Sequence, residues 1–139
     1  MFILSLLPKP VWLIVIVIII MRPLLLNVAK EEFIMTKIFL GNAFSLQMLD
    51  VTVDNTVNIV PANVDEIADS NFMSVIGHAD TAAVVSNILN RDVPANRASV
   101  RLEKGDILYV AQVTGGRLPE GATTLPEGFA LAFLKVTIQ

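Results

Sequence analysis

The 139-residue chain contains no cysteine and only one histidine, His78. Without cysteine it cannot form a disulfide, a thiolate nucleophile or a cysteine-based zinc site, and one histidine excludes a His-rich metal site within a single chain. The sequence also lacks the P-loop, G-x-G-x-x-G, H-E-x-x-H and G-x-S-x-G motifs of common cofactor-binding proteins and hydrolases. We therefore expect no cofactor and no metal ion, and this composition fits a reducing, cytoplasmic location.

Positive charge is also scarce, because 10 Lys and Arg residues stand against 13 Asp and Glu residues, a formal net charge of −3. This balance argues against a protein that coats nucleic acid, so no stable DNA or long RNA partner is expected. The charges are unevenly placed, since residues 37–90 are mostly acidic and residues 91–117 mostly basic. Two interpretations are open, a solvated face and a local site for a small anion.

A long apolar run occurs only near the start, at Val11–Ile20. It is short for a bilayer span, which needs about 20 apolar residues. Residues 1–35 have two interpretations: a membrane-associating segment, with contact through residues 11–28, or an upstream extension included by too early a start codon. Met35 begins a sequence typical of the start of a domain, which favours the second interpretation and predicts a domain over residues 36–139.

The pattern of residues 36–139 predicts an α/β or α+β domain with about five strands in a mixed sheet and about three helices. The predicted strands are Thr36–Leu40, Thr56–Ala62, Ala98–Leu102, Asp106–Val113 and Phe129–Ile138. The third and fourth strands would form a hairpin through the link 103–105, and the last would lie inside the sheet. The predicted helices are a short one after a cap at Ser45, one capped by Asp65 that runs to about Val75, and one capped by Asp80 that ends at Asn90.

His78 directly precedes the third predicted helix. The first amides of a helix lack partners and its dipole is positive there, so this position can cradle a phosphate. The dipole disfavours an imidazolium in the empty site, whereas a bound phosphodiester favours it and would make His78 a general acid. A histidine that serves only as a structural residue before a helix is the open alternative.

Further polar residues lie at the ends of predicted elements. Arg97 and Arg117 can each contact phosphate oxygens through two nitrogen atoms. Glu120, three residues after Arg117, can instead pair with it on the surface as ordinary solvated charge. Arg117 and Glu120 both fall in the connection 114–128, which is rich in Gly, Pro and Thr. Connections of this length in a small domain are usually functional or disordered.

Four segments together resemble the viral ring nuclease family, the anti-CRISPR enzymes that destroy the cyclic tetra-adenylate messenger of type III CRISPR defence. The segments are FLGNAFSLQML (39–49), SVIGHADTAAVVSNIL (74–89), NRASVRLEKGDILYVAQV (96–113) and GRLPEG (116–121). The combination of N-A-F-S, I-G-H and R-L-x-E-G is specific, although each piece alone is weak. The resemblance covers essentially all of residues 36–139.

The resemblance implies a role for each matching residue. The catalytic histidine of the family falls on His78, and its loop arginine and glutamate fall on Arg117 and Glu120. The implied ligand contacts are Asn42, Ser45, Thr81, Arg97 and Gln112. The sequence departs from the family pattern at Ala79 and Asp80, where relatives have a D-S pair, and at Gln47, which replaces an Asn.

The implied activity is metal-independent cleavage of cyclic tetra-adenylate to linear di-adenylates with 2′,3′-cyclic phosphate ends. A ribose 2′-OH is the nucleophile, and His78 would protonate the leaving 5′-oxygen. Two cuts per ring and one histidine per chain predict a C₂ homodimer. A small nucleic-acid-binding or interaction protein without catalytic activity is the alternative.

Overall fold

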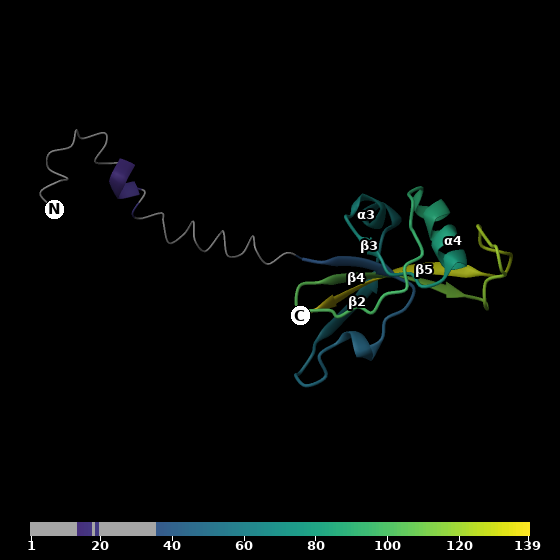
Figure 1. Ribbon diagram of the computed structural model, residues 1–139, viewed down its shortest axis with the longest axis horizontal. Helices are drawn as coiled ribbons and strands as arrows, with labels where there is room; N and C mark the ends of the chain where they lie inside the picture. Colours follow the sequence, from purple (N-terminus) through teal and green to yellow (C-terminus); the bar gives the residue numbers. More distant parts are fainter. Residues whose placement is uncertain (1–13, 18, 20–35) are drawn as a thin grey trace, which may run out of the picture. The chain divides into compact units, whose positions relative to one another are not determined.

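The structure, a computed structural model, describes residues 14–17, 19 and 36–139 (Figure 1). The chain divides into residues 1–35 and residues 36–139, and each unit is described by itself. In the first unit residues 14–17 and 19 are helical, and Ile14, Val17 and Ile19 are exposed. The rest of the predicted membrane-contact segment, 11–28, lies outside the described residues, as does Met35. None of the described helices has both the length and the apolar character that crossing a bilayer requires.

Residues 36–139 form a mixed five-stranded sheet in the order β2-β5-β4-β1-β3. The strands are β1 (Ile38–Gly41), β2 (Val57–Pro61), β3 (Met73–Ser74), β4 (Ile107–Thr114) and β5 (Ala130–Ile138). Strand β1 is parallel to both β3 and β4, whereas β5 is antiparallel to β4 and β2. Three helices complete the domain: the 3₁₀ helix η1 (Leu46–Met48), α3 (Val64–Asp69) and α4 (Ala79–Leu89). The predicted α+β class is confirmed, and β5 lies inside the sheet as predicted.

The two faces of the sheet are covered differently. Helices α3 and α4 lie on one face (Figure 1), where Ile67 of α3 and Val85 of α4 are fully buried against residues such as Leu40 of β1. The other face carries η1 and residues 98–102, and its core includes Val100, Leu102 and Leu108. Both faces of the central strands are therefore packed, which explains why β4 and β5 are apolar on successive residues.

The predicted hairpin of Ala98–Leu102 with the following strand is wrong. Strand β4 already has β1 on one side and β5 on the other, so no edge remains for a hairpin partner. Residues 98–102 form no strand, and the Leu102 N–H donates to the carbonyl of Met48 at 2.8 Å. The alternating apolar residues Val100 and Leu102 are buried against the sheet face instead of paired within the sheet.

The predicted helix from Asp65 to about Val75 is also wrong. Asn63 is the N-cap, because its side chain accepts a 2.8 Å hydrogen bond from the Asp65 amide. The helix stops at Asp69, where Ser70 adopts an extended conformation. Residues 72–76 then alternate between buried and more exposed positions, which is the period of a strand, and Met73–Ser74 pair with β1. This short pairing supplies the fifth strand in place of 98–102.

Candidate functional site

The site lies at the carboxyl ends of three neighbouring parallel strands, β3, β1 and β4. Each strand delivers a predicted site residue there: Asn42 follows β1, His78 comes shortly after β3, and Gln112 lies near the end of β4. Ligand sites of open α/β sheets commonly occupy this edge, because the strands end together and their loops converge. The topology therefore brings these residues to one edge of the sheet, where Asn42 and Gln112 line a different hollow from that of His78.

His78 is the N-cap residue of α4, and its side chain makes no capping hydrogen bond. The carbonyl of His78 accepts the first helical hydrogen bond, from Ala82 N at 3.0 Å. The imidazole is exposed, so it remains available to a ligand near the first turn of the helix. The prediction that Asp80 caps α4 is wrong, because Asp80 lies inside the first turn and its carboxylate accepts a bond from a distant amide, Gly121 N–H.

A hollow of about 170 Å³ unites three of the predicted site residues, His78, Thr81 and Arg117. Its remaining lining residues are Asp80, Val113, Gly116 and Leu118. The hollow thus joins the start of α4 to the end of β4 and to the loop that follows it. The residues that line it carry an imidazole, a hydroxyl and a guanidinium, which can hold a phosphate and move a proton at it, beside the Asp80 carboxylate that is bonded to Gly121.

Arg97 lies beside the same helix start. A Cβ added at Gly77 would lie 3.5 Å from Arg97 Nε, so the arginine side chain passes over Gly77, the residue before His78. Asn96 fixes this position, because its backbone N–H donates to the Ile76 carbonyl at 2.8 Å and its side-chain amide to the Ser74 carbonyl at 2.9 Å. The glycine of the I-G-H sequence therefore leaves room for the arginine side chain.

The other predicted ligand residues lie in separate hollows of the chain. Asn42 and Gln112 line one of about 290 Å³ on the sheet face opposite α4, together with Phe44. Ser45 lines another of about 710 Å³, which also includes Arg101. The Ser45 hydroxyl accepts from the Gln47 amide at 3.3 Å, which confirms its predicted role as a helix cap.

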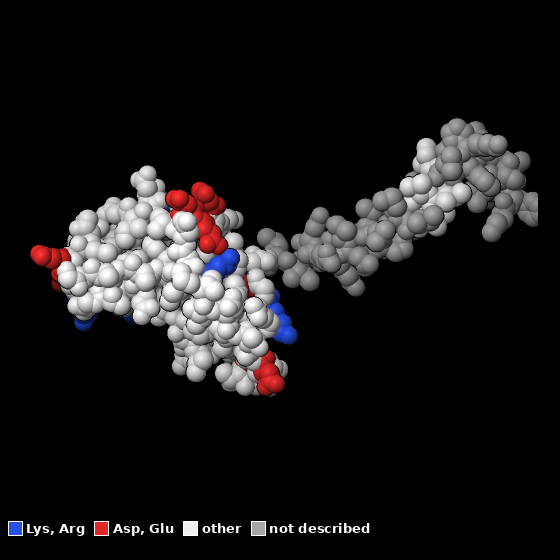
Figure 2. Space-filling view, turned by 180° about the vertical axis from the view of Figure 1, so that it is seen from behind, with Lys and Arg blue, Asp and Glu red and all other residues white. Residues whose placement is uncertain are grey.

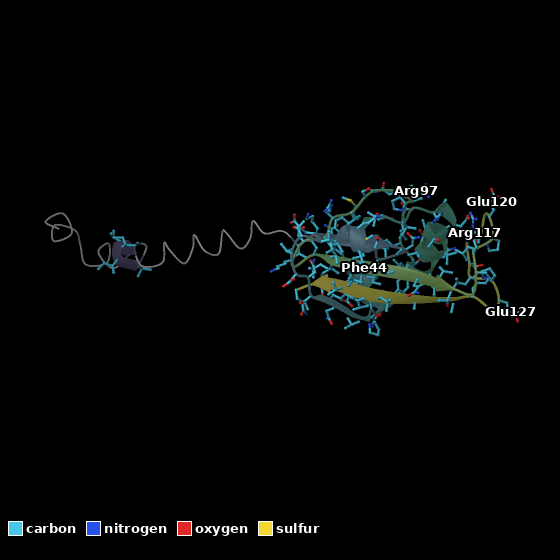
Figure 3. All side chains as sticks on the ribbon, turned by 90° about the horizontal axis from the view of Figure 1, so that it is seen from below. Phe44, Arg97, Arg117, Glu120 and Glu127 are labelled. Carbon is cyan, nitrogen blue, oxygen red and sulfur yellow. The ribbon has the colours of Figure 1, made fainter. Side chains whose placement is uncertain are left out.

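Glu120 is exposed and is not among the residues that line the hollow beside His78. Figure 3 shows Arg117 and Glu120 at the end of the domain formed by the loop after β4, with Glu120 near its outer rim. The structure therefore places Glu120 near the site without bringing its carboxylate into the hollow.

Sequence reasoning missed three residues of this hollow, Val113, Gly116 and Leu118, and misassigned Asp80. Leu118 is an apolar residue within a Gly- and Pro-rich loop, and it is buried with 9% exposure. An apolar residue in such a loop is the sequence signal that the loop packs against the domain. Nothing local in the sequence indicates that Asp80 reaches a residue 41 positions away.

The clearest pKa shifts lie away from the helix start. Glu66 of α3 accepts hydrogen bonds from Lys135 and Tyr109, which lower the pKa of its carboxyl. Burial and the bond to Glu66 raise the pKa of Tyr109 to about 12. Asp50 accepts from the side chain and the amide of Thr52, which lower its pKa. These shifts belong to structural contacts of α3 and of the turn after η1.

Positive charge is dispersed on the face shown in Figure 2. On the face shown in Figure 2 most of the surface is uncharged, and the Lys and Arg side chains lie apart without forming a continuous basic stripe. Within residues 14–17, 19 and 36–139 no three His, Asp or Glu side chains lie close enough together to bind a metal ion. The local arginines at the helix start are therefore the feature that favours an anionic ligand there.

The α+β fold agrees with the comparisons to known proteins. Residues 38–131 match the STIV B116-like family, and the chain belongs to that family. Its structure is similar to that of B116 of Sulfolobus turreted icosahedral virus, with a TM-score of 0.58 and 24% identity, over 73% of this chain and 98% of the viral protein. That likeness establishes the shared fold. A search of curated proteins found no match.

Proposed function

We propose that the protein is a metal-independent ring nuclease that cleaves cyclic tetra-adenylate to linear di-adenylates ending in 2′,3′-cyclic phosphate. The observation that carries the proposal is the hollow in which His78, Thr81 and Arg117 meet at the start of α4. These residues fall on the motifs through which the sequence resembles viral ring nucleases. Cleavage of this messenger would switch off type III CRISPR defence in the cytoplasm of the host cell.

In the proposed reaction the ribose 2′-oxygen attacks the adjacent phosphorus and the bond from phosphorus to the 5′-oxygen breaks. The His78 imidazolium gives its proton to the departing 5′-oxygen, while the 2′-OH proton passes to Glu120 or to water. Arg117, Arg97 and the first amides of α4 would stabilise the additional negative charge on the phosphorane-like transition state. Such a reaction requires alignment of the ribose more than any added nucleophile.

Glu120 could act only after its loop moves, since its carboxylate lies outside the hollow. A local movement of Pro119 and Glu120 toward a bound ring, with Leu118 and Gly121 still attached to the domain, would bring the Glu120 carboxylate to the ribose. The proposal therefore assigns His78 a role before and after this movement and Glu120 a role only after it.

The proposal includes a C₂ homodimer. One chain offers a single His78, whereas opening the ring into two equal halves requires two cuts related by a two-fold axis. In one chain the hollow of Asn42 and Gln112 is separate from that of His78. A second copy would let one ring contact both kinds of surface, with the four phosphates near the arginines of both chains.

The test is incubation of the purified protein with cyclic tetra-adenylate in EDTA, followed by chromatography and mass spectrometry of the products. We expect di-adenylates with cyclic phosphate ends. His78→Ala should slow cleavage by roughly 10²–10⁴-fold, the range for a lost general acid, and still bind the ring. Lys104→Ala, in the exposed turn before β4, is the control and should cleave at the wild-type rate.

Intact ligand with the wild-type protein would refute the proposal. So would equal cleavage by the wild type and His78→Ala. If the protein instead binds long RNA or DNA with an affinity that falls steeply with salt, it is a nucleic-acid-binding module without this activity.

A further inference from the structure

The geometry points to Asp80 as a positioning residue that fastens the loop after β4 to helix α4 and thereby sets the place of Arg117 beside His78. This inference rests on the proposed function for its catalytic consequence. Asp80 lies in the first turn of α4, and its Oδ1 accepts a hydrogen bond from Gly121 N–H at 2.9 Å. A carboxylate acceptor makes this contact stronger than a bond between two neutral groups.

The bond from Asp80 is one of three attachments of the loop to the body of the domain. The Asn87 side-chain amide, two turns further along α4, donates to the Thr123 carbonyl. Leu118 is buried with 9% exposure, so it anchors the part of the loop before Gly121. Two of the attachments, those of Asp80 and Asn87, are bonds to α4 itself, and Figure 1 shows the turn between β4 and β5 near that helix.

The base of the loop is fixed independently. A Cβ added at Gly115 would lie 2.6 Å from the Gly128 carbonyl oxygen, so the two ends of the loop touch through their backbones. Gly115 and Gly116 have φ values of 110° and 134°, which only glycine adopts readily. A fixed base and a fixed middle leave little freedom for the residues between them.

Arg117 lies between the base of the loop at Gly115 and the attachment at Gly121, and the next residue, Leu118, is buried. Arg117 lines the hollow with His78, and the attachments on either side of it hold it there. This placement does not require a hydrogen bond from the Arg117 side chain to the body of the domain. The negative charge of Asp80 disfavours a phosphate in the same hollow, so the geometry supports a role for Asp80 in the bond to Gly121 and not in ligand binding. The same charge at the start of α4 also interacts favourably with the helix dipole.

The test compares Asp80→Ala and Asp80→Asn in the full chain by amide hydrogen exchange of residues 115–128, without ligand. Asp80→Ala should speed exchange of the Gly121 amide by about tenfold, as expected when a charge-assisted hydrogen bond is lost from a loop. Asp80→Asn keeps a carbonyl oxygen in the same place and should remain within about threefold of the wild type. Asp92→Ala, an exposed aspartate beyond the end of α4, is the control and should not change exchange.

Cleavage of cyclic tetra-adenylate is measured on the same variants. Asp80→Ala should raise KM by about tenfold with a smaller effect on kcat, because the displaced Arg117 loses contact with the bound ring. Asp80→Asn should restore KM to the wild-type value or below, since it keeps the attachment and removes a charge that repels phosphate. A thermal melt of each variant separates this effect from a general loss of stability.

The two hypotheses fail in different ways. Wild-type exchange of Gly121 in Asp80→Ala would overturn the positioning role whatever the protein cleaves, as would an Asp80→Asn variant that behaves like Asp80→Ala. A wild-type protein that leaves the ring intact would overturn the proposed function and the effect on KM, while the exchange data would still decide whether Asp80 holds the loop.

Discussion

The backbones of Gly115 and Gly128 touch, because a Cβ on Gly115 would stand 2.6 Å from the Gly128 carbonyl oxygen and 2.9 Å from Cα of Phe129. These residues stand just after β4 and just before β5, at the base of the loop that carries Arg117 and Glu120. The contact needs a residue without a side chain at position 115. The glycine at position 115 is therefore required by the close approach of two backbone segments of the chain as well as by turn formation.

Gly115→Ala should lower the free energy of unfolding by about 2 kcal/mol, since it adds a steric clash to an unfavourable backbone conformation. Gly105→Ala is the matched control: its φ is 89°, but a Cβ there meets no atom within 4 Å, so only the backbone strain of about 1 kcal/mol is expected. Urea unfolding followed by circular dichroism measures both. Equal losses for the two variants would contradict the predicted contact.

Arg117→Ala should lower kcat/KM for cyclic tetra-adenylate by about 10²-fold, which is typical when one donor to a developing anion is removed. Arg117→Lys should recover only part of this loss, because an ammonium cannot contact two oxygens as a guanidinium does. Lys104→Ala removes one positive charge at the opposite end of β4 and controls for net charge. A loss in Lys104→Ala as large as in Arg117→Ala would show a general electrostatic effect instead of a local one.

Ser74→Ala should destabilise the domain by about 1–2 kcal/mol, because the buried Ser74 hydroxyl donates to the Pro94 carbonyl at 2.6 Å and its loss leaves that carbonyl without this partner. The segment that carries Arg97 is tied to β3 by this bond and by those of Asn96, so cleavage should decline as well. Thermal unfolding measures the first effect, with Ser99→Ala, an exposed serine, as the control. A midpoint unchanged by Ser74→Ala would show that Asn96 alone holds the segment.

The stability of the domain should fall between pH 10 and pH 12 through Tyr109. Burial and the bond to Glu66 raise its pKa from 10.0 to about 12, so the folded state keeps a proton that the unfolded state has already lost. The stabilisation is fully present below pH 10 and disappears as the pH rises through the folded pKa. Between pH 9.5 and pH 11 the free energy of unfolding should decrease by about 1 kcal/mol more in the wild type than in Tyr109→Phe. Parallel decreases in urea unfolding would refute this assignment.

Local patterns predicted the elements whose signals are local. Ser45, before η1, has the side chain expected of an N-cap. Asn90, after α4, has the left-handed backbone conformation expected at the end of a helix, with a φ of 52°. The continuous apolar run that ends the chain predicted β5 as an interior strand, because a strand packed on both faces has no polar side. The class of the fold followed from these elements.

Long-range pairing caused the errors. Val100 and Leu102 alternate as a strand does, yet the positions on either side of β4 are taken by β1 and β5. Phe72 and Ile76 fit a helical spacing and a strand spacing equally well, and only the pairing of Met73 with Phe39 decides between them. In the site, His78 is predicted from its place before a helix and Thr81 from the resemblance to viral ring nucleases, whereas the attachment of Asp80 to Gly121 depends on a contact that no local pattern contains.

The pairing of β1 with β4 also bears on how the domain reaches its native state. Ile38 pairs with Ile107, and the neighbouring Lys37 amide bonds to the Asp106 carboxylate across a separation of 69 residues. Loops of that length close slowly, and sheets built from distant segments fold slowly for the same reason. On the ribosome, β1 would leave the exit tunnel long before β4 and β5 exist to join it, so the central sheet can assemble only after residues 107–138 have emerged.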